Sequence, residues 1–517
     1  MMYNIDIILS PKEVSDFNTI KRLLAKKLEI NEEIIIKVEL VKKSLDARNG
    51  KVNYQVRANV YTDNESIPVQ EKFVYKNAGN KKVLIIGAGP AGLFASLRLL
   101  ENGIKPIIIE RGKDVHNRKK DIALLNRNVE LNKNSNYCFG EGGAGTFSDG
   151  KLFTRSSKRG DVSKVLKILN LHGAKDEILY ESHPHIGSDK LPKIIENIRA
   201  TILNNGGEFH FDSKVTDFII VQNQLKGVII NDSNEFFAEN VILATGHSSR
   251  DIYELLYKRN IHIEAKPFAL GVRIEHPQEL INEIQYGKNY NPEYLPNAIY
   301  SLVNNYNNRG TYSFCMCPGG FIVPASTESN EMVVNGMSPS SRNTPYANSG
   351  IVVELKLTDF EEFKDFRALC GLKYQNAIEQ MAFNNGGLGF IAPAQRLTDF
   401  ITGKLSQDLP FNSYIPGVVS SPIHFWLPEV ISSNLKQAFL AFDKKMRGYI
   451  TNEAIILGVE SRTSSAIRIS RNKDTLEHLE IKGLYPCGEG AGYAGGIVSS
   501  AIDGDNVAQK IIEKLGM

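Results

Sequence analysis

Three glycines and one acidic residue, Gly87, Gly89, Gly92 and Glu110, carry the clearest chemical signal in the sequence. The glycines follow the apolar run 83–86, and the acid closes the next apolar run. Glycines in such a turn let the backbone approach phosphate, and an acid in that place can accept hydrogen bonds from ribose hydroxyls. The spacing therefore predicts a site for the diphosphate of a dinucleotide. A glycine-rich turn in an unrelated α/β domain is the alternative.

The elements that must position these residues follow in order along the chain. Residues 83–86 are expected to form a buried parallel strand, and 107–109 the next strand. Between them, 93–100 is expected to form a helix whose N-terminus faces the diphosphate, with Pro90 and Ala91 in the turn before it. This order is typical of a Rossmann-like α/β domain.

Three later segments carry further ligand-binding signals. The loop 139–151 has five glycines among thirteen residues, so its backbone amides can approach a ligand without obstruction by Cβ atoms. The runs 240–246 and 481–496 each join an apolar strand to small residues. These two runs resemble the second and third signatures of FAD-binding proteins with a glutathione-reductase-like nucleotide domain. In such proteins the late acid, here Glu489, accepts hydrogen bonds from the ribityl chain, and the next helix faces the diphosphate.

The whole order resembles the bacterial family of uncharacterised FAD-dependent dehydrogenases, also described as NAD(P)/FAD-dependent oxidoreductases. The resemblance extends over most of the chain and includes the motifs at 44–48, 139–151, 183–187, 315–320, 458–464 and 488–496. It implies a bound FAD and a redox role. The residues expected to hold FAD are Gly87, Gly89, Pro90, Ala91, Gly92, Glu110, Arg111, Gly142, Gly143, Gly145, Thr146, Lys151, Val215, Ala244, Thr245, Gly246, Gly488, Glu489, Gly495, Gly496 and Ile497.

The predicted fold class is α/β. We expect a Rossmann-like, glutathione-reductase-type FAD-binding domain, an inserted α+β substrate domain and a small N-terminal α/β domain. The N-terminal domain is expected at 1–76, the two parts of the FAD-binding domain at 82–265 and 458–517, and the substrate or cap domain at 266–457.

Few side chains are expected to take part in the chemistry, because a flavin carries the electron transfer itself. Arg462 is expected to contact an anionic substrate or the flavin, and a salt bridge with Glu460 or a nearby acid is the alternative. His185 is a candidate proton donor beside the flavin, and a hydrogen-bonded structural histidine is the alternative. The histidines lack the ligand number and spacing of a zinc site, so no metal is expected.

Cys315 and Cys317 invite comparison with disulfide reductases. Residues separated by one position point to opposite faces of a strand, so a disulfide between them would be strained. A buried or loop position near the substrate is therefore the main expectation, and a redox-active pair is the alternative.

Composition limits the partners. A net charge of +3 over 517 residues gives no field that favours nucleic acid or an anionic membrane, and neither is expected as a partner. Five cysteines are few and odd in number, which suits the cytoplasm. No transmembrane segment is expected, and the oligomeric state stays open.

These observations predict a cytoplasmic FAD-dependent oxidoreductase that passes a hydride through flavin N5 to or from a small organic substrate. No second dinucleotide motif is visible, so NAD(P)H, as a transient electron donor, would have to bind the flavin face directly. One alternative is a flavin-containing redox sensor that binds a protein or RNA partner and turns over little. Another is a flavin-dependent monooxygenase, which needs an NAD(P)H contact that the sequence does not indicate.

Overall fold

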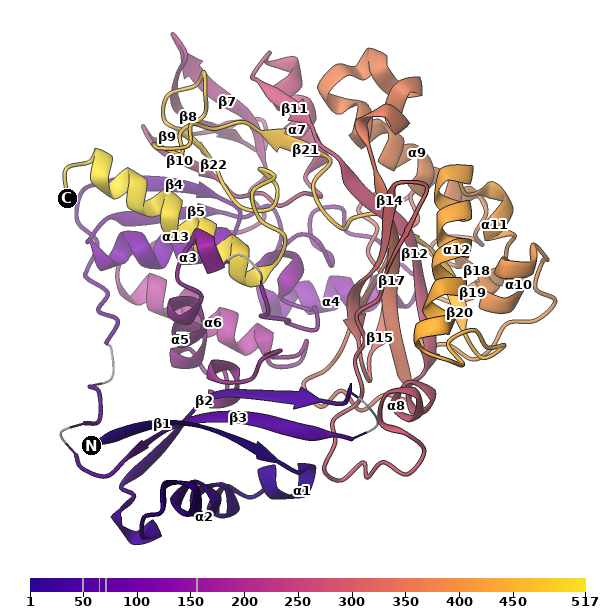
Figure 1. Ribbon diagram of the computed structural model, residues 1–517. Coiled ribbons are helices and arrows are strands. Elements are labelled where there is room, and N and C mark those ends of the chain that lie inside the picture. The colour runs from indigo at the N-terminus through magenta and orange to yellow at the C-terminus, as the bar shows by residue number, and fades with distance from the viewer. Residues whose placement is uncertain (49–50, 65, 70–71, 155–156) are drawn as a thin grey trace.

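The computed structural model describes residues 1–48, 51–64, 66–69, 72–154 and 157–517. These residues form an N-terminal unit, a domain built on a parallel sheet and a middle domain built on a largely antiparallel sheet. In Figure 1 the N-terminal unit lies beneath the other two parts.

The N-terminal unit is a three-stranded antiparallel sheet with helices on one face. Its elements are β1 (Met2–Leu9), α1 (Pro11–Val14), α2 (Phe17–Leu28), the 3₁₀ helix η1 (Glu32–Ile34), β2 (Lys37–Asp46) and β3 (Asn53–Tyr61). Ile20 and Leu24 of α2 share a core with Val56 of the central strand β3. Strand β2 attaches the unit to the parallel-sheet domain, because the Lys43 amide donates to the Tyr180 carbonyl at 2.8 Å.

The parallel-sheet domain has five parallel strands drawn from distant parts of the chain. In spatial order they are β22 (Leu484–Pro486), β10 (Val241–Leu243), β4 (Lys82–Ile86), β5 (Lys105–Ile109) and β6 (Glu208–His210). An antiparallel meander precedes β10 and consists of β7 (Val215–Val221), β8 (Gln224–Ile230) and β9 (Asn234–Phe237). The helices of this domain are α3 (Pro90–Glu101), α4 (Val115–Asn126), η3 (Gly143–Gly145), η4 (Ser157–Arg159), α5 (Val162–Leu171), η5 (Asp176–Leu179), α6 (Leu191–Asn204), α7 (Arg250–Lys258) and α13 (Ile497–Lys514).

The last helix, α13, packs directly along α3 (Figure 1). Gly504 permits this close approach, because a Cβ atom at this position would lie 2.0 Å from the Ala91 carbonyl oxygen. Val498, Ala501 and Ile502 of α13 are buried in the same core as α3. The C-terminal segment is therefore an integral layer of the parallel-sheet domain.

The middle domain is built on a seven-stranded sheet. Its strands in spatial order are β13 (Val303–Tyr306), β14 (Arg309–Cys317), β17 (Tyr346–Leu355), β12 (Phe268–Pro277), β20 (Ile455–Glu460), β18 (Ala392–Arg396) and β19 (Val418–Ser420). A ribbon of β15 (Phe321–Pro324) and β16 (Val334–Met337) also belongs to this domain, whereas the ribbon of β11 (Ile263–Ala265) and β21 (Ile467–Ile469) shares a core with the parallel-sheet domain. The helices are α8 (Gln278–Tyr286), η6 (Leu357–Leu369), α9 (Cys370–Asn384), α10 (Leu397–Thr402), α11 (Ile423–Trp426) and α12 (Glu429–Lys445).

Strand β20 lies inside this sheet, hydrogen-bonded to β12 on one side and β18 on the other. The boundary predicted between residues 457 and 458 falls within the strand, which continues to Glu460. All six residues of β20 are buried, because the strand is central in its sheet. The border between the middle domain and the second part of the parallel-sheet domain therefore lies after Glu460.

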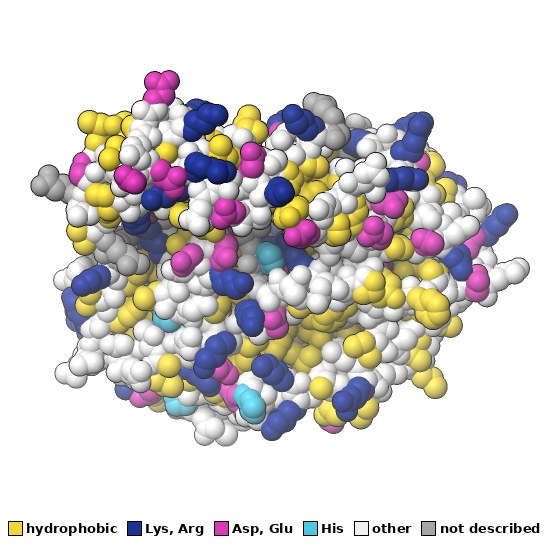
Figure 2. Space-filling model, turned by 90° about the horizontal axis from the view of Figure 1, so that it is seen from below, with side chains coloured by type: hydrophobic (Ala, Val, Ile, Leu, Met, Phe, Trp, Pro, Cys, Tyr) yellow, Lys and Arg dark blue, Asp and Glu magenta, His cyan; other side chains and the backbone are white. Residues whose placement is uncertain are grey.

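Within the described ranges, every helix is too short or too polar to cross a lipid bilayer. Figure 2 shows the face seen from the side of the N-terminal unit, where Lys and Arg side chains are interspersed with Asp and Glu.

Candidate functional site

A cavity of about 390 Å³ lies where the parallel-sheet and middle domains meet. It is at the carboxyl ends of the parallel strands, where open α/β sheets bind their ligands. It is lined by eighteen of the residues expected to hold FAD, namely Gly87, Gly89, Pro90, Ala91, Glu110, Arg111, Gly143, Gly145, Lys151, Val215, Ala244, Thr245, Gly246, Gly488, Glu489, Gly495, Gly496 and Ile497.

The first turn requires glycine for packing. Gly87 has a φ of 105°, and a Cβ atom there would lie 2.4 Å from the Ala244 carbonyl oxygen. Gly92 does not line the cavity, and a Cβ atom at this position would lie 2.0 Å from the Gly87 carbonyl oxygen. It therefore serves the contact between turn and helix rather than the approach of a ligand.

The helices α3, α7 and α13 all begin at the cavity, and two of them follow a glycine. Helix α3 begins after Gly89 and α13 after Gly496, and no side chain of the described residues caps either end. Free helix N-termini and their dipoles suit a diphosphate. Around Gly495 and Gly496, no heavy atom comes within 4 Å of an added Cβ position, so the backbone borders open space. These features fit the diphosphate and ring of a flavin dinucleotide.

Glu110 organises the turn as well as lining the cavity. Its Oε2 accepts a hydrogen bond from the Ala88 amide at 2.9 Å, and its Oε1 accepts from the Gly112 and Gly140 amides at 2.9 and 3.0 Å. Because a carboxylate oxygen has two lone pairs, Oε2 keeps acceptor capacity for a ribose hydroxyl. The carboxylate therefore fastens the first turn to the loop 139–151.

Arg111 and Val215 line the same end of the cavity as Glu110. The Arg111 guanidinium lies 4.1 Å from the centre of the Phe139 ring and donates to Asp251 at 3.0 Å. Val215 is buried at the start of β7. Together these groups form a wall suited to an adenosine.

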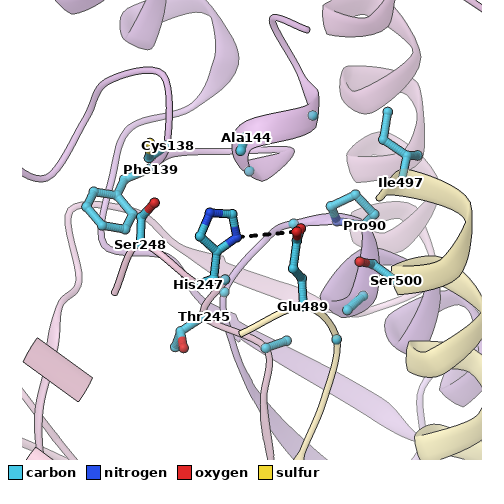
Figure 3. Close-up of a pocket in the computed structure, with 18 of the residues that line it drawn as sticks. Pro90, Cys138, Phe139, Ala144, Thr245, His247, Ser248, Glu489, Ile497 and Ser500 are labelled. Carbon is cyan, nitrogen blue, oxygen red and sulfur yellow. Dashed lines mark ion pairs between the residues drawn. The ribbon is translucent and has the colours of Figure 1, made fainter. Parts of the chain in front are cut away.

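Glu489 and His247 meet inside the cavity, with Nδ1 of His247 3.4 Å from Oε1 of Glu489 (Figure 3). Figure 3 shows both side chains between Pro90 and Ile497 on one side and Ser248 on the other. Glu489 thus lines the cavity with an imidazole nitrogen beside its carboxylate. No sequence motif indicated that His247 would contact Glu489.

Gly142 and Thr146 lie behind the cavity wall. The Gly142 amide donates to the Ala88 carbonyl at 2.8 Å, and Thr146 Oγ1 donates to the Glu141 carbonyl at 2.8 Å. They shape the loop 139–151, whereas Gly143 and Gly145 of the same loop reach the cavity.

Arg118 is a supporting residue that no sequence motif indicated. Its fully buried guanidinium donates to the carbonyls of Asn136, Tyr137 and Glu141 at 2.8, 3.1 and 2.7 Å. Burial lowers its pKa to about 10. It holds the loop 139–151 from behind, and an arginine in the polar α4 segment gave no sequence signal for that.

Arg462 lines the cavity but belongs to a buried ion-pair network. Its Nη2 lies 2.9 Å from Glu331 Oε2 and 3.1 Å from Glu379 Oε2. Arg250 pairs with the same two carboxylates. Two guanidinium groups thus neutralise two carboxylates at the cavity wall.

Glu460, the partner named for Arg462 from sequence, pairs instead with Arg273 at 3.0 Å. Arg273 is wholly buried and also donates to Asn348 Oδ1 at 2.8 Å. Gly336 leaves room for it, because a Cβ atom there would lie 2.1 Å from Arg273 Nη2. The salt bridge of Arg462 is therefore made to Glu331 and Glu379.

His185 lies outside the cavity lining. Its Nε2 is 3.4 Å from the Ser340 carbonyl oxygen, and its backbone forms a bridge with Lys151. Burial and the nearby Arg342 charge lower its pKa. This arrangement is that of a hydrogen-bonded structural histidine, which corrects the expectation of a proton donor at the flavin.

Cys315 lines the cavity and Cys317 is buried behind it. Lys151 Nζ is 3.7 Å from each sulfur atom. Among the residues that the structure describes, no cluster of histidines, cysteines and acids could hold a metal ion.

Domain models match most of the chain. The model "FAD-dependent protein, C-terminal domain-like" matches residues 267–463, an FAD binding domain matches 80–134, and a domain of unknown function, DUF8436, matches 1–61.

An uncharacterised protein of Clostridium beijerinckii is 41% identical over 527 residues, covering 97% of both chains. The tRNA uridine 5-carboxymethylaminomethyl modification enzyme MnmG of Alkaliphilus metalliredigens is 27% identical over 33% of this chain and 24% of its own. Glycine oxidase from Bacillus cereus superposes with a TM-score of 0.34 and 14% identity, covering 84% of this chain and 96% of its own.

The full-length relative and the matched domains agree with the dinucleotide cavity described above. FAD is the cofactor of this protein, and the chain belongs to a bacterial family of FAD-dependent proteins.

Proposed function

We propose that this protein transfers a hydride between FAD and a small organic substrate, with FAD held in the manner of the glutathione-reductase type. One observation carries this proposal: the middle domain contributes Phe314, Cys315, Asn335 and Arg462 to the cavity that the diphosphate turn also lines. A substrate held by the middle domain would therefore lie beside the cofactor.

The chain's own residues divide the binding task. The turn 87–90 and the N-terminus of α3 would receive the diphosphate, and Glu110 and Arg111 would flank the ribose. Glu489 would accept from the ribityl chain, and the N-terminus of α13 would face the pyrimidine side of the ring, where it would stabilise negative charge. When bound, FAD supplies two-electron hydride chemistry through N5.

We further expect the protein to act in the cytoplasm and to work without nucleic acid or membrane partners. NAD(P)H is the candidate electron donor and would approach the flavin face directly. No observation among the described residues favours a sensor with little turnover.

The first experiment is to purify the protein, record its visible spectrum and release the chromophore by heat for mass identification. Anaerobic addition of NADH, NADPH and a panel of organic reductants then tests whether each compound transfers a hydride to FAD. FAD that bleaches within seconds with one of them supports the proposal. FAD that stays oxidised with every reductant, or no flavin after reconstitution, contradicts it.

A further inference from the structure

The Cys315 and Cys317 side chains lie on the same side of β14, because the strand contains a bulge. Phe314 pairs with Gly350 and Cys317 with Asn348, so three residue steps on β14 oppose two on β17. Cys315 takes up the extra residue with a φ of 46°, a conformation rare for a non-glycine residue and often found at functional sites. The opposite-face argument made from the sequence therefore does not apply here.

Two cations converge on this thiol pair. Lys151 Nζ lies 3.7 Å from both sulfur atoms. Arg273 Nη2 lies 2.7 Å from the Cys315 carbonyl oxygen and 3.6 Å from Cys317 Sγ. Positive charge held this close to a thiol stabilises its thiolate form.

The two thiols differ in their ionisation. The hydrogen bond from Cys317, together with the charges of Lys151 and Arg273, places the pKa of Cys315 well below its ordinary value in spite of burial. The same hydrogen bond and burial raise the pKa of Cys317. Within the pair, ionisation is therefore favoured at Cys315 and disfavoured at Cys317.

The two thiols also differ in access. Cys315 is half-buried and lines the FAD cavity, whereas Cys317 has no exposed surface. An accessible thiolate with a buried thiol beside it is the arrangement needed for attack on a disulfide, followed by resolution of the mixed disulfide.

We propose that Cys315 and Cys317 form a redox-active pair that passes two electrons from reduced FAD to an external disulfide substrate. The proposal rests on the proposed function, in which a hydride donor of the NAD(P)H class reduces FAD. The Cys315 thiolate attacks one sulfur of the substrate, and the first substrate thiolate leaves. Cys317 then loses its proton and attacks Cys315 Sγ, which releases the second substrate thiolate and leaves a Cys315–Cys317 disulfide. Two electrons and a proton from reduced FAD break this disulfide and restore one thiolate and one thiol.

An anaerobic reductive titration tests the pair directly. The holoprotein is oxidised with diamide, freed of the oxidant and titrated with dithionite. The wild type should take up four electron equivalents per FAD, two for the flavin and two for the disulfide, whereas Cys315→Ser and Cys317→Ser should each take up two. Cys370→Ser, which alters a half-buried cysteine on α9, is the matched control and should take up four. Uptake of two by the wild type would overturn the proposal.

Two further measurements do not depend on flavin turnover. Peptide mass analysis of the diamide-treated protein should find Cys315 joined to Cys317, and free thiols at both positions would contradict the proposal. The pH profile of iodoacetamide labelling at Cys315 should shift to higher pH in Lys151→Met, since that variant loses the nearby cation. If FAD binds and accepts two electrons while both cysteines stay reduced, this inference fails and the hydride-transfer proposal stands. A protein without FAD would instead defeat the hydride-transfer proposal.

Discussion

Glu489 and His247 face each other at 3.4 Å inside the cavity, although the whole middle domain separates them in the sequence. Each follows a strand of the parallel sheet, β22 and β10 respectively, and these two strands are neighbours. The contact shows that the late acid reaches the cavity only because β22 returns to the first half of the domain.

Glu489→Gln should weaken FAD binding about tenfold, because a hydrogen bond to a charged acceptor contributes about 1.5–3 kcal/mol and the neutral amide accepts less strongly. Fluorescence titration of the apoprotein with FAD measures the change. Glu480→Gln, an exposed position on the same C-terminal segment, is the control and should leave FAD affinity unchanged. Equal affinity of both variants would remove Glu489 from the binding site.

Gly87→Ala and Gly495→Ala should separate folding from binding. At Gly87 the new methyl group would meet the Ala244 carbonyl at 2.4 Å with a φ of 105°, so the melting temperature should fall by at least about 5 °C. At Gly495 the methyl group meets no heavy atom within 4 Å, so the melting temperature should stay unchanged. Its Cβ atom borders the cavity, however, and FAD affinity should fall. Thermal melts and FAD titrations of both apoproteins check this, and a large loss of stability in Gly495→Ala would be inconsistent with the packing described.

Arg462→Met should destabilise the protein by about 3–5 kcal/mol, because Glu331 and Glu379 would keep only Arg250 as a cation. Burial favours a raised pKa for Glu379, but Arg250 and Arg462 outweigh it and hold the pKa at about 2. Without Arg462 this pKa rises toward its ordinary value of 4.5, so the wild type loses more of the stabilisation from Glu379 than the variant does as the pH falls below 4.5. The deficit of the variant should therefore shrink between pH 5 and 3. Urea unfolding at both pH values measures the difference in the free energy of unfolding between the wild type and the variant. Arg468→Met, at an exposed position nearby, is the control. A deficit below about 1 kcal/mol would contradict the network's role.

Glu275→Gln should stabilise the protein increasingly as the pH rises. Burial raises the pKa of Glu275 to about 7 from an ordinary value of 4.5, although the Ser413 amide and hydroxyl donate to it. Between these two pH values the folded state binds more protons than the unfolded state, so the wild type loses stability as the pH rises through this window. The glutamine variant does not lose stability in this way. Its free energy of unfolding, relative to that of the wild type, should therefore increase by about 1–3 kcal/mol between pH 5 and 8. Urea unfolding across this range measures the difference. A flat difference, like that expected for the exposed control Glu453→Gln, would mean that Glu275 ionises normally.

The local pattern of the nucleotide site was predictable, because it depends on neighbours in sequence. The strand, glycine turn, helix and acid from 82 to 110 occur in the predicted order, since apolar periodicity and glycine placement specify them locally. The helix begins at Pro90, however, three residues earlier than predicted, so Gly92 lies in its first turn rather than before it. Gly92, Gly142 and Thr146 were predicted as ligand contacts but support the wall instead. A sequence shows that a small residue is required without showing which neighbour requires it.

Long-range partners were not predictable from the sequence. Arg462 meets Glu331 and Glu379 rather than the nearby Glu460, because β20 sends Glu460 to Arg273 inside the sheet. The bulge in β14 likewise has no local signature, and it reverses the geometric argument about Cys315 and Cys317.

The seating of α13 against α3 has a consequence for the order of synthesis. A ribosome makes the first glycine turn and Glu110 before the middle domain, and it makes β22 and α13 after that domain. Until then β10 has no β22 beside it, and the N-terminus of α13 is missing from the cavity. The cavity therefore stays incomplete while the middle domain is being synthesised, and we expect FAD to be captured only after α13 has been added.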